Sequence, residues 1–146
     1  MEVLVPEVEK LKGGQVYLEV GVDRGKSLSV ARMVAKEGVD VWGVDLQEDP
    51  EVEGTNFMRG NSKEMAKLCK FKIDVLFVDA DHSYGGCKQD IESWYPKMAK
   101  HGVMLFHDAD ETSPGVVKAV EEFAKENKLT AWFSPDQRCS MARLGL

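Results

Sequence analysis

Five polar residues in the middle of the chain could do acid–base or metal chemistry together. They follow directly after two apolar runs, Ile73–Val78 and Val103–Phe106. The five are Asp79, Asp81, His82, His107 and Asp108. A carboxylate after the first run, with His107 and Asp108, could hold a divalent cation that orients an acceptor hydroxyl. Alternatively, His82 or His107 could take the proton of that hydroxyl directly. The plainer interpretation is that one aspartate caps a helix and His82 is a surface hydrogen-bonding group.

A glycine-rich turn, EVGVDRGKS, begins at Glu19. Gly21 and Gly25 permit a tight turn and a close approach of a ligand to the backbone, and Ser27 could cap the helix that follows or lie in its first turn. A dinucleotide site would carry glycine where Asp23 stands, and Glu19 adds a second carboxylate that would repel a pyrophosphate. Two acids suit a ligand with an ammonium and a sulfonium, as in the methionine half of S-adenosylmethionine. A plain strand-to-helix turn is the alternative.

Two more candidate positions follow earlier apolar runs. Asp45 lies 24 residues after Gly21, a spacing at which an acid can accept hydrogen bonds from ribose hydroxyls. Asn61 and Ser62 follow the next short run, and the amide of Asn61 has both the donor and the acceptor needed to read an adenine edge. Asp45 could instead be an ordinary cap, and Asn61 and Ser62 could instead begin a helix.

The elements that would position these groups alternate between short β-branched runs and amphipathic stretches. We expect strands at Val16–Val20, Val39–Val44, Asn56–Met58, Ile73–Val78, Val103–Phe106, Leu129–Phe133 and Met141–Leu144. Strands that are apolar nearly throughout, separated by helices, indicate a doubly wound, Rossmann-like α/β fold with a mostly parallel sheet. We expect a single domain over residues 1–146. Ligands of such sheets bind beyond the carboxyl ends of the strands, where the candidate residues lie.

Composition and aromatic residues add further expectations. The 19 basic and 25 acidic residues give a net charge of −6 with no basic run, so we expect no nucleic-acid partner. The chain has no apolar run of 18 residues, so we expect no membrane partner. Three widely spaced cysteines, Cys69, Cys87 and Cys139, fit neither a disulfide framework nor a zinc site and predict reduced thiols in a cytoplasmic protein.

The tryptophans Trp42, Trp94 and Trp132 lie in apolar patterns, so we expect them in the core. Tyr84 differs, because it begins a helical pattern just after Asp81 and His82. Its hydroxyl could therefore face the same cleft as the acids and histidines.

Four segments of the chain resemble the class I S-adenosylmethionine-dependent methyltransferases. They are VYLEVGVDRGKSLSVA, WGVDL, IDVLFVDADHSYGGCKQDIESWYPKMAKHGVMLFHD and PGVVKAVEEF. Within that family the resemblance is strongest to a small-molecule O-methyltransferase group with sugar and antibiotic-tailoring members. It implies a seven-stranded sheet of order 3-2-1-4-5-7-6 with the seventh strand antiparallel, and a cofactor lying across the tips of the first, second and fourth strands.

The resemblance also assigns roles to residues. Glu19, Gly21 and Gly25 match the methionine-binding turn, with Ser27 just beyond it, and Asp45 matches the ribose acid. Asn61 and Ser62 match the adenine-side pair, although the family often has Asp at the place of Asn61.

In metal-using relatives a cation such as magnesium is held by an acid after the fourth strand and by an acidic pair after the fifth. Asp79 and Asp108 match those positions, and Asp79 also borders the cofactor site. His107 stands in place of the second acid, which makes the ligand set softer and keeps metal-free proton transfer by a histidine open.

The expected function is transfer of a methyl group from S-adenosylmethionine to a small hydroxylated or glycosidic metabolite, with His82, His107 and Asp108 as catalytic candidates. A cofactor-binding module without turnover is the alternative. Asp23 in the glycine turn and the lack of a substrate domain disfavour a nicotinamide-dependent oxidoreductase. Only fifteen residues precede the first expected strand, so the roof over the acceptor is thin. Either a second subunit of a homodimer completes the site, or a large acceptor approaches an open face.

Overall fold

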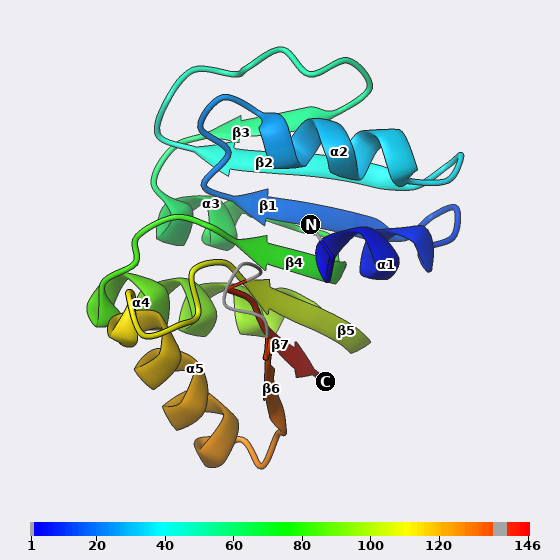
Figure 1. Cartoon of the computed structure of the whole chain (residues 1–146). Coiled ribbons are helices and arrows are strands. Elements are labelled where there is room, and N and C mark those ends of the chain that lie inside the picture. Colours follow the sequence, from blue (N-terminus) through cyan, green and yellow to red (C-terminus); the bar gives the residue numbers. More distant parts are fainter. Residues whose placement is uncertain (1, 136–139) are drawn as a thin grey trace.

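The computed structural model describes residues 2–135 and 140–146, and these form one seven-stranded sheet with helices on both faces (Figure 1). The strand order is β3-β2-β1-β4-β5-β7-β6. The strands are β1 Val16–Val20, β2 Asp40–Asp45, β3 Asn56–Arg59, β4 Ile73–Val78, β5 Met98–Phe106, β6 Ala131–Phe133 and β7 Ala142–Gly145. Strands β1 to β5 pair in parallel, and β7 runs antiparallel to both β5 and β6. The predicted fold class and strand order are confirmed.

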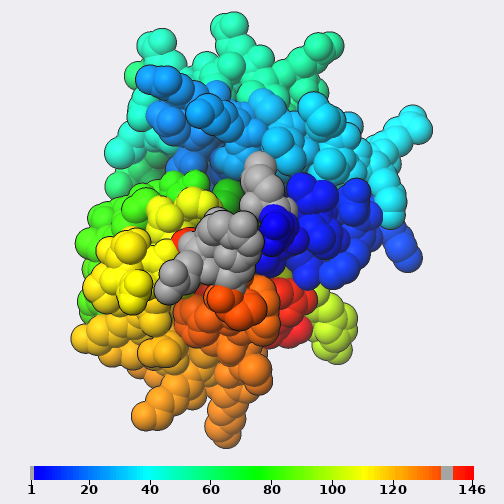
Figure 2. All heavy atoms as spheres, viewed as in Figure 1, coloured from blue at the N-terminus to red at the C-terminus, as the bar shows by residue number. Residues whose placement is uncertain are grey.

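The helices divide the core into two layers. They are α1 Leu4–Glu9, α2 Lys26–Val34, α3 Ser62–Leu68, α4 Tyr84–Trp94, the 3-10 turn η1 Tyr95–Lys97 and α5 Pro114–Glu126. Because side chains alternate along a strand, Tyr17 of β1 packs with α1 and α2, whereas its neighbour Leu18 packs with α3, α4 and α5. In the space-filling view, α1 (dark blue) and α2 close over one face of the sheet (Figure 2).

The N-terminal segment contains the short helix α1, which the sequence analysis did not predict. Leu4, Val8 and Leu11 recur at helical spacing and are buried against the sheet. Glu7 of α1 accepts a hydrogen bond of 2.9 Å from Nε of Arg143 in β7. The apolar spacing was a signal that could have predicted this helix.

Other expectations are partly corrected. Trp94 is fully buried and Trp42 packs against the core, but Trp132 on the edge strand β6 is 44% exposed, so its expected burial is wrong. Cys69 and Cys87 are free buried thiols, and Cys139 lies outside the described residues. Among the described helices, none has both the length and the apolar character needed to cross a bilayer.

The parallel pairing of β2, β1, β4 and β5 places their carboxyl ends at one edge of the sheet (Figure 1). The glycine turn leaves this edge after β1, and Asp45 is the last residue of β2. Asp79 follows β4 and His107 follows β5. Residues far apart in the sequence therefore meet at one place.

Candidate functional site

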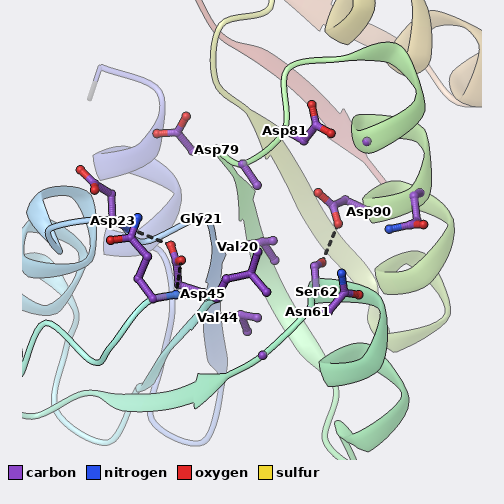
Figure 3. Close-up of a pocket in the computed structure, with 16 residues that line it drawn as sticks. Val20, Gly21, Asp23, Val44, Asp45, Asn61, Ser62, Asp79, Asp81 and Asp90 are labelled. Carbon is purple, nitrogen blue, oxygen red and sulfur yellow. Dashed lines mark hydrogen bonds between the residues drawn. The ribbon is translucent and has the colours of Figure 1, made fainter.

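A cavity of about 430 Å³ opens at this edge of the sheet, between the ends of β1, β2 and β4 and the start of α4 (Figure 3). Five of its lining side chains are aspartates: Asp23, Asp45, Asp79, Asp81 and Asp90. Among the described residues that line it, none is a lysine, an arginine or a histidine. The cavity therefore favours a ligand that carries positive charge.

Gly21 is required by the close approach of two backbone segments beneath the cavity. It has a φ of +88°, and a Cβ at this position would lie 2.1 Å from the carbonyl oxygen of Asp79 and 2.8 Å from Cα of Ala80. Only glycine can therefore connect β1 to α2 while the loop after β4 stays in place. Gly25, also with positive φ, precedes α2 against Val52 and does not line the cavity.

Glu19 lies below the cavity and not on its wall. Its carboxylate is fully buried and accepts hydrogen bonds from the Tyr17 hydroxyl at 2.8 Å and the Ser27 hydroxyl at 2.5 Å. Burial, with the nearby charges of Asp79 and Asp45, raises the pKa of Glu19 to about 7, although the two hydrogen bonds oppose this shift. Neither Glu19 nor Ser27 lines the cavity, so together they support the glycine turn from beneath.

Asp45 both lines the cavity and holds the turn. Its Oδ2 accepts hydrogen bonds from the backbone N–H groups of Val22 and Asp23 at 2.8 and 2.9 Å, and its Oδ1 accepts one from Gln47 at 2.9 Å. Partial burial would raise the pKa of Asp45, but the backbone donors outweigh it and hold that pKa below its usual value. The side chain is therefore an ionised acceptor at the cavity wall.

Asn61 and Ser62 both line the cavity and also begin α3, so their two interpretations are compatible. Oδ1 of Asn61 caps the helix by accepting a hydrogen bond from the backbone of Lys63 at 3.1 Å. The Ser62 hydroxyl accepts a hydrogen bond of 2.8 Å from Trp94 Nε1 and donates one of 2.5 Å to Asp90. Our sequence analysis missed Asp90, although an acid beside Ile91 on the apolar face of a helix was a usable signal.

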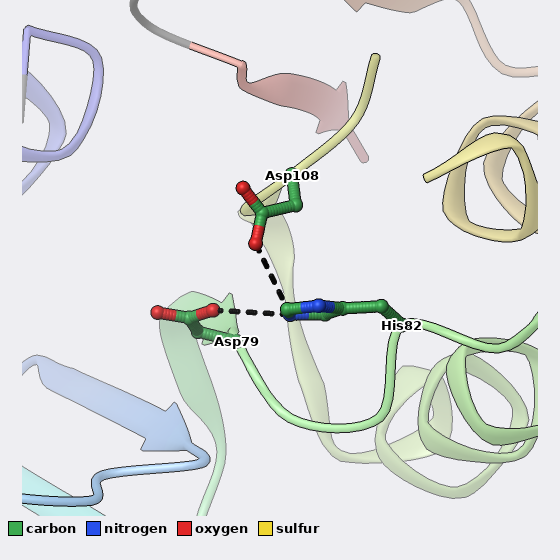
Figure 4. A group of neighbouring side chains, drawn as sticks. All are labelled: Asp79, His82 and Asp108. Atoms are coloured by element: carbon green, nitrogen blue, oxygen red, sulfur yellow. Dashed lines mark ion pairs between the residues drawn. The ribbon is translucent and has the colours of Figure 1, made fainter. Parts of the chain in front are cut away.

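The acids and histidines after β4 and β5 form one cluster beside the cavity. His82 Nε2 lies 3.5 Å from Asp79 Oδ1 and 3.3 Å from Asp108 Oδ2 (Figure 4). His107 Nδ1 lies 3.4 and 3.2 Å from the same two oxygens. Asp108 has a φ of +51°, a left-handed conformation that aspartate tolerates better than most residues. Two carboxylates therefore lie between two imidazoles.

The electrostatics of this cluster affect its histidines. His107 Nδ1 is buried and finds no hydrogen bond of good geometry among the described residues, so its attraction to the carboxylates is mainly ionic. Asp79, assisted by Asp108, raises the pKa of His107 to about 9 against the opposing effect of burial. Burial would raise the pKa of Asp79, but the two imidazoles lower it.

The cluster could also hold a metal ion. One ligand atom from each of Asp79, His82 and Asp108 lies within 4.8 Å of the other two. The sequence predicted Asp79, His107 and Asp108 as ligands, whereas the group that the structure brings together has His82 in place of His107. An imidazole with two carboxylates is a donor set for a hard or borderline divalent cation.

The sequence analysis allowed the Tyr84 hydroxyl to face the cavity, but in the structure it points to α5 instead. Its hydroxyl donates a hydrogen bond of 2.5 Å to Glu122 of α5, and Lys118 Nζ lies 4.6 Å from the centre of its ring. Asp81 does line the cavity, and its Oδ1 accepts a hydrogen bond of 2.8 Å from the backbone of Ser83 at the start of α4. Tyr84 is thus part of the contact between α4 and α5.

Comparison with known proteins relates this geometry to a family. A family model described as "Methyltransferase domain" matches residues 18–109, which include the glycine turn and both polar strand ends. The protein y4gI of Sinorhizobium fredii, described as uncharacterized, is 42% identical over 43 residues, which are 30% of this chain and 5% of that protein. The matched part is thus a small fraction of that relative.

Solved structures share the fold at low sequence identity. CalS11, a TDP-rhamnose 3′-O-methyltransferase of calicheamicin biosynthesis, is 17% identical with a TM-score of 0.73, over 99% of this chain and 76% of its own. An O-methyltransferase from Bacillus cereus is 15% identical with a TM-score of 0.76, over 99% and 80%. A candidate rRNA methylase from Clostridium thermocellum is 13% identical with a TM-score of 0.72, over 99% and 94%. These similarities establish the fold and leave the acceptor open.

Proposed function

The chain belongs to the methyltransferase domain family, and on that premise we propose that it transfers a methyl group from S-adenosylmethionine to a hydroxyl of a small hydroxylated or glycosidic metabolite. The observation that carries this proposal is the acidic cavity at the carboxyl ends of β1, β2 and β4, which borders a cluster of carboxylates and imidazoles. The cavity suits a cationic cofactor, and the cluster suits activation of an acceptor hydroxyl.

The cavity residues fit the parts of this cofactor. Asp23 and Asp79 put negative charge at the glycine turn, where an ammonium and a sulfonium would be stabilised. Asp45 is an ionised acceptor for ribose hydroxyls. When bound, S-adenosylmethionine supplies an activated methyl group, so the protein has to align the acceptor oxygen and exclude water.

The acceptor hydroxyl must lose its proton to a group near Asp79 and Asp108. His107 is protonated at neutral pH because its pKa is about 9, so it is a poor base there. His82 bridges the two carboxylates and is the better candidate for accepting the proton. Alternatively, a divalent cation such as magnesium held by Asp79, His82 and Asp108 would favour the alkoxide of the acceptor.

The class of acceptor, the cellular location and the oligomeric state are also part of the proposal. The acidic cavity and the net charge of −6 favour a small-molecule acceptor over nucleic acid. The free buried thiols of Cys69 and Cys87 favour a cytoplasmic location. We also propose a homodimer in which a second copy covers the open side of the cavity, and we propose no membrane partner.

The proposal is tested first by calorimetric titration with S-adenosylmethionine and S-adenosylhomocysteine, with NADH as the rival ligand. We expect micromolar binding of both adenosyl ligands and none of NADH. Methyl transfer to a panel of hydroxylated acceptors, with and without magnesium, then separates an enzyme from a binding module. Asp108→Asn should lower methyl transfer at least about tenfold and leave cofactor affinity nearly unchanged.

Glu111→Gln removes an exposed acid from the same segment after β5 and is the matched control. Methyl transfer by Glu111→Gln should equal that of the wild type. Binding of NADH in place of the adenosyl ligands would overturn the proposal. Adenosyl binding without turnover on any acceptor would support the binding module.

A further inference from the structure

Asp90 is a buried carboxylate that the proposed mechanism does not use. It lies on α4, is only 4% exposed, and lines the cavity at the side formed by Asn61 and Ser62 (Figure 3). Its neighbours on the same helical face, Cys87 and Ile91, are core residues. A charged group at such a position costs stability unless something in the cavity pairs with it.

The hydrogen bonds of Ser62 fix the direction of this carboxylate. Trp94 Nε1 can only donate, so the Ser62 oxygen accepts its hydrogen bond and the Ser62 proton goes to Asp90 Oδ1. Asp90 Oδ1 is therefore occupied. Among the described residues no donor reaches Asp90 Oδ2, and Figure 3 shows the carboxylate directed to the cavity.

Asn61 supplies the complementary group. Its Oδ1 is occupied by the cap of α3, so the Nδ2 amide, for which no acceptor is present among the described residues, is the group left for a ligand. Together, Asp90 Oδ2 is a free acceptor and Asn61 Nδ2 is a free donor on adjoining parts of one wall. An adenine edge carries the reverse pair, a 6-amino donor next to the N1 acceptor.

We propose that Asp90 is the specificity-determining residue for the base of the cofactor, accepting a hydrogen bond from the 6-amino group of adenine while Asn61 donates to N1. This inference rests on the proposed function. The acceptor for the adenine amino group is thus placed on α4, because the side-chain oxygen of Asn61 already caps α3. Hypoxanthine, with an oxygen at position 6 and a proton on N1, presents the wrong pair to both residues.

A purely structural role for Asp90 is less consistent with these contacts. A link between α3 and α4 needs one oxygen, and an asparagine could accept the Ser62 proton equally well. The second oxygen then only adds the cost of burying a charge, and burial raises the pKa of Asp90 above its usual value. Groups that cost stability but serve a ligand are typical of binding sites.

The test is calorimetric titration of the full chain with three ligands: S-adenosylhomocysteine, its 6-oxo analogue S-inosylhomocysteine, and the analogue with hydrogen at position 6. Wild-type protein should bind the adenosyl ligand about ten- to hundredfold more tightly than either analogue. In Asp90→Asn the amide nitrogen faces the cavity as a donor. The ratio of the affinity for the adenosyl ligand to that for the inosyl ligand should then fall to about one or below one.

Asp23→Asn is the matched control, because it removes one charge from the same cavity at a distance from the adenine side. This variant should bind all three ligands more weakly by the same factor and leave the ratios of their affinities at the wild-type values. The melting temperature of ligand-free Asp90→Asn should equal or exceed that of the wild type. A clearly lower melting temperature with unchanged ligand ratios would show that Asp90 is structural.

The wild-type titration alone can also overturn the proposed role of Asp90, even if a variant does not fold. Equal affinity for the adenosyl ligand and the 6-hydrogen analogue would overturn the role of Asp90 and leave the cofactor proposal intact. Failure of all three ligands to bind would instead remove the proposed function.

Discussion

Asp45 shows how one side chain serves both the backbone and the ligand. Its carboxylate accepts hydrogen bonds from two backbone N–H groups of the turn after β1 and from one of the segment after β2, and the same carboxylate lines the cavity. Replacing Asp45 with alanine leaves those backbone donors unpaired and removes the acceptor for ribose.

We expect Asp45→Ala to weaken S-adenosylmethionine binding by about thirtyfold or more, measured by calorimetry. Asp49→Ala is the control, because Asp49 accepts a similar backbone hydrogen bond from Glu51 but does not line the cavity. Affinity in Asp49→Ala should stay within about twofold of the wild type. An Asp45→Ala protein that binds as tightly as the wild type would disprove the ribose assignment.

At the scale of residues, spacing along the chain predicted which side chains reach the strand ends but not always which way they point. Asp45 and Asp79 lie at strand ends and line the cavity, as expected. Glu19, also near a strand end, points into the core because side chains alternate along β1. Asp90 was missed because its contact with Ser62 joins two helices that are distant in sequence.

At the scale of elements, the first turn of α4 contains two glycines, Gly85 and Gly86, that have different surroundings. A Cβ on Gly86 would lie 2.2 Å from Asp81 Oδ2, whereas no atom of the described residues would lie within 4 Å of a Cβ on Gly85. Gly86 therefore allows Asp81 to lie against the first turn of α4 at the cavity wall. Gly85 has no such packing role.

We expect Gly86→Ala to displace Asp81 and weaken S-adenosylmethionine binding by about three- to tenfold. Gly85→Ala should leave affinity unchanged and stabilise the free protein by about 0.5–1 kcal/mol, because alanine favours helix over glycine. Calorimetry and thermal melting of the two variants measure both effects. Equal affinities of the two variants for S-adenosylmethionine would show that the position of Asp81 at the cavity wall does not contribute to binding.

The elements were more predictable than their contacts. Strand positions followed from apolar runs, although β5 begins at Met98, five residues before the expected start. The packing role of Gly115 in α5 was not predicted, because a Cβ there would lie 2.5 Å from the backbone nitrogen of Tyr84, a contact between distant segments that local patterns do not encode.

At the scale of the whole molecule, charge distinguishes substrate from product. The chain carries a net charge of −6, and the described lining of the cavity has five aspartates and no basic side chain. S-Adenosylmethionine carries one more positive charge than S-adenosylhomocysteine, because methyl transfer removes the sulfonium. The field of the protein should therefore attract the substrate and release the product more readily.

Raising the salt concentration from about 0.05 M to about 0.5 M should weaken S-adenosylmethionine binding by about two- to fivefold more than S-adenosylhomocysteine binding, because ions screen the extra charge. Calorimetric titration of both ligands over this range measures the two slopes. Asp23→Asn, with one negative charge fewer at the cavity, should reduce the difference between the slopes. Parallel slopes in the wild type would mean that the sulfonium does not sense the aspartates, and that hydrogen bonds and apolar contacts alone hold the cofactor.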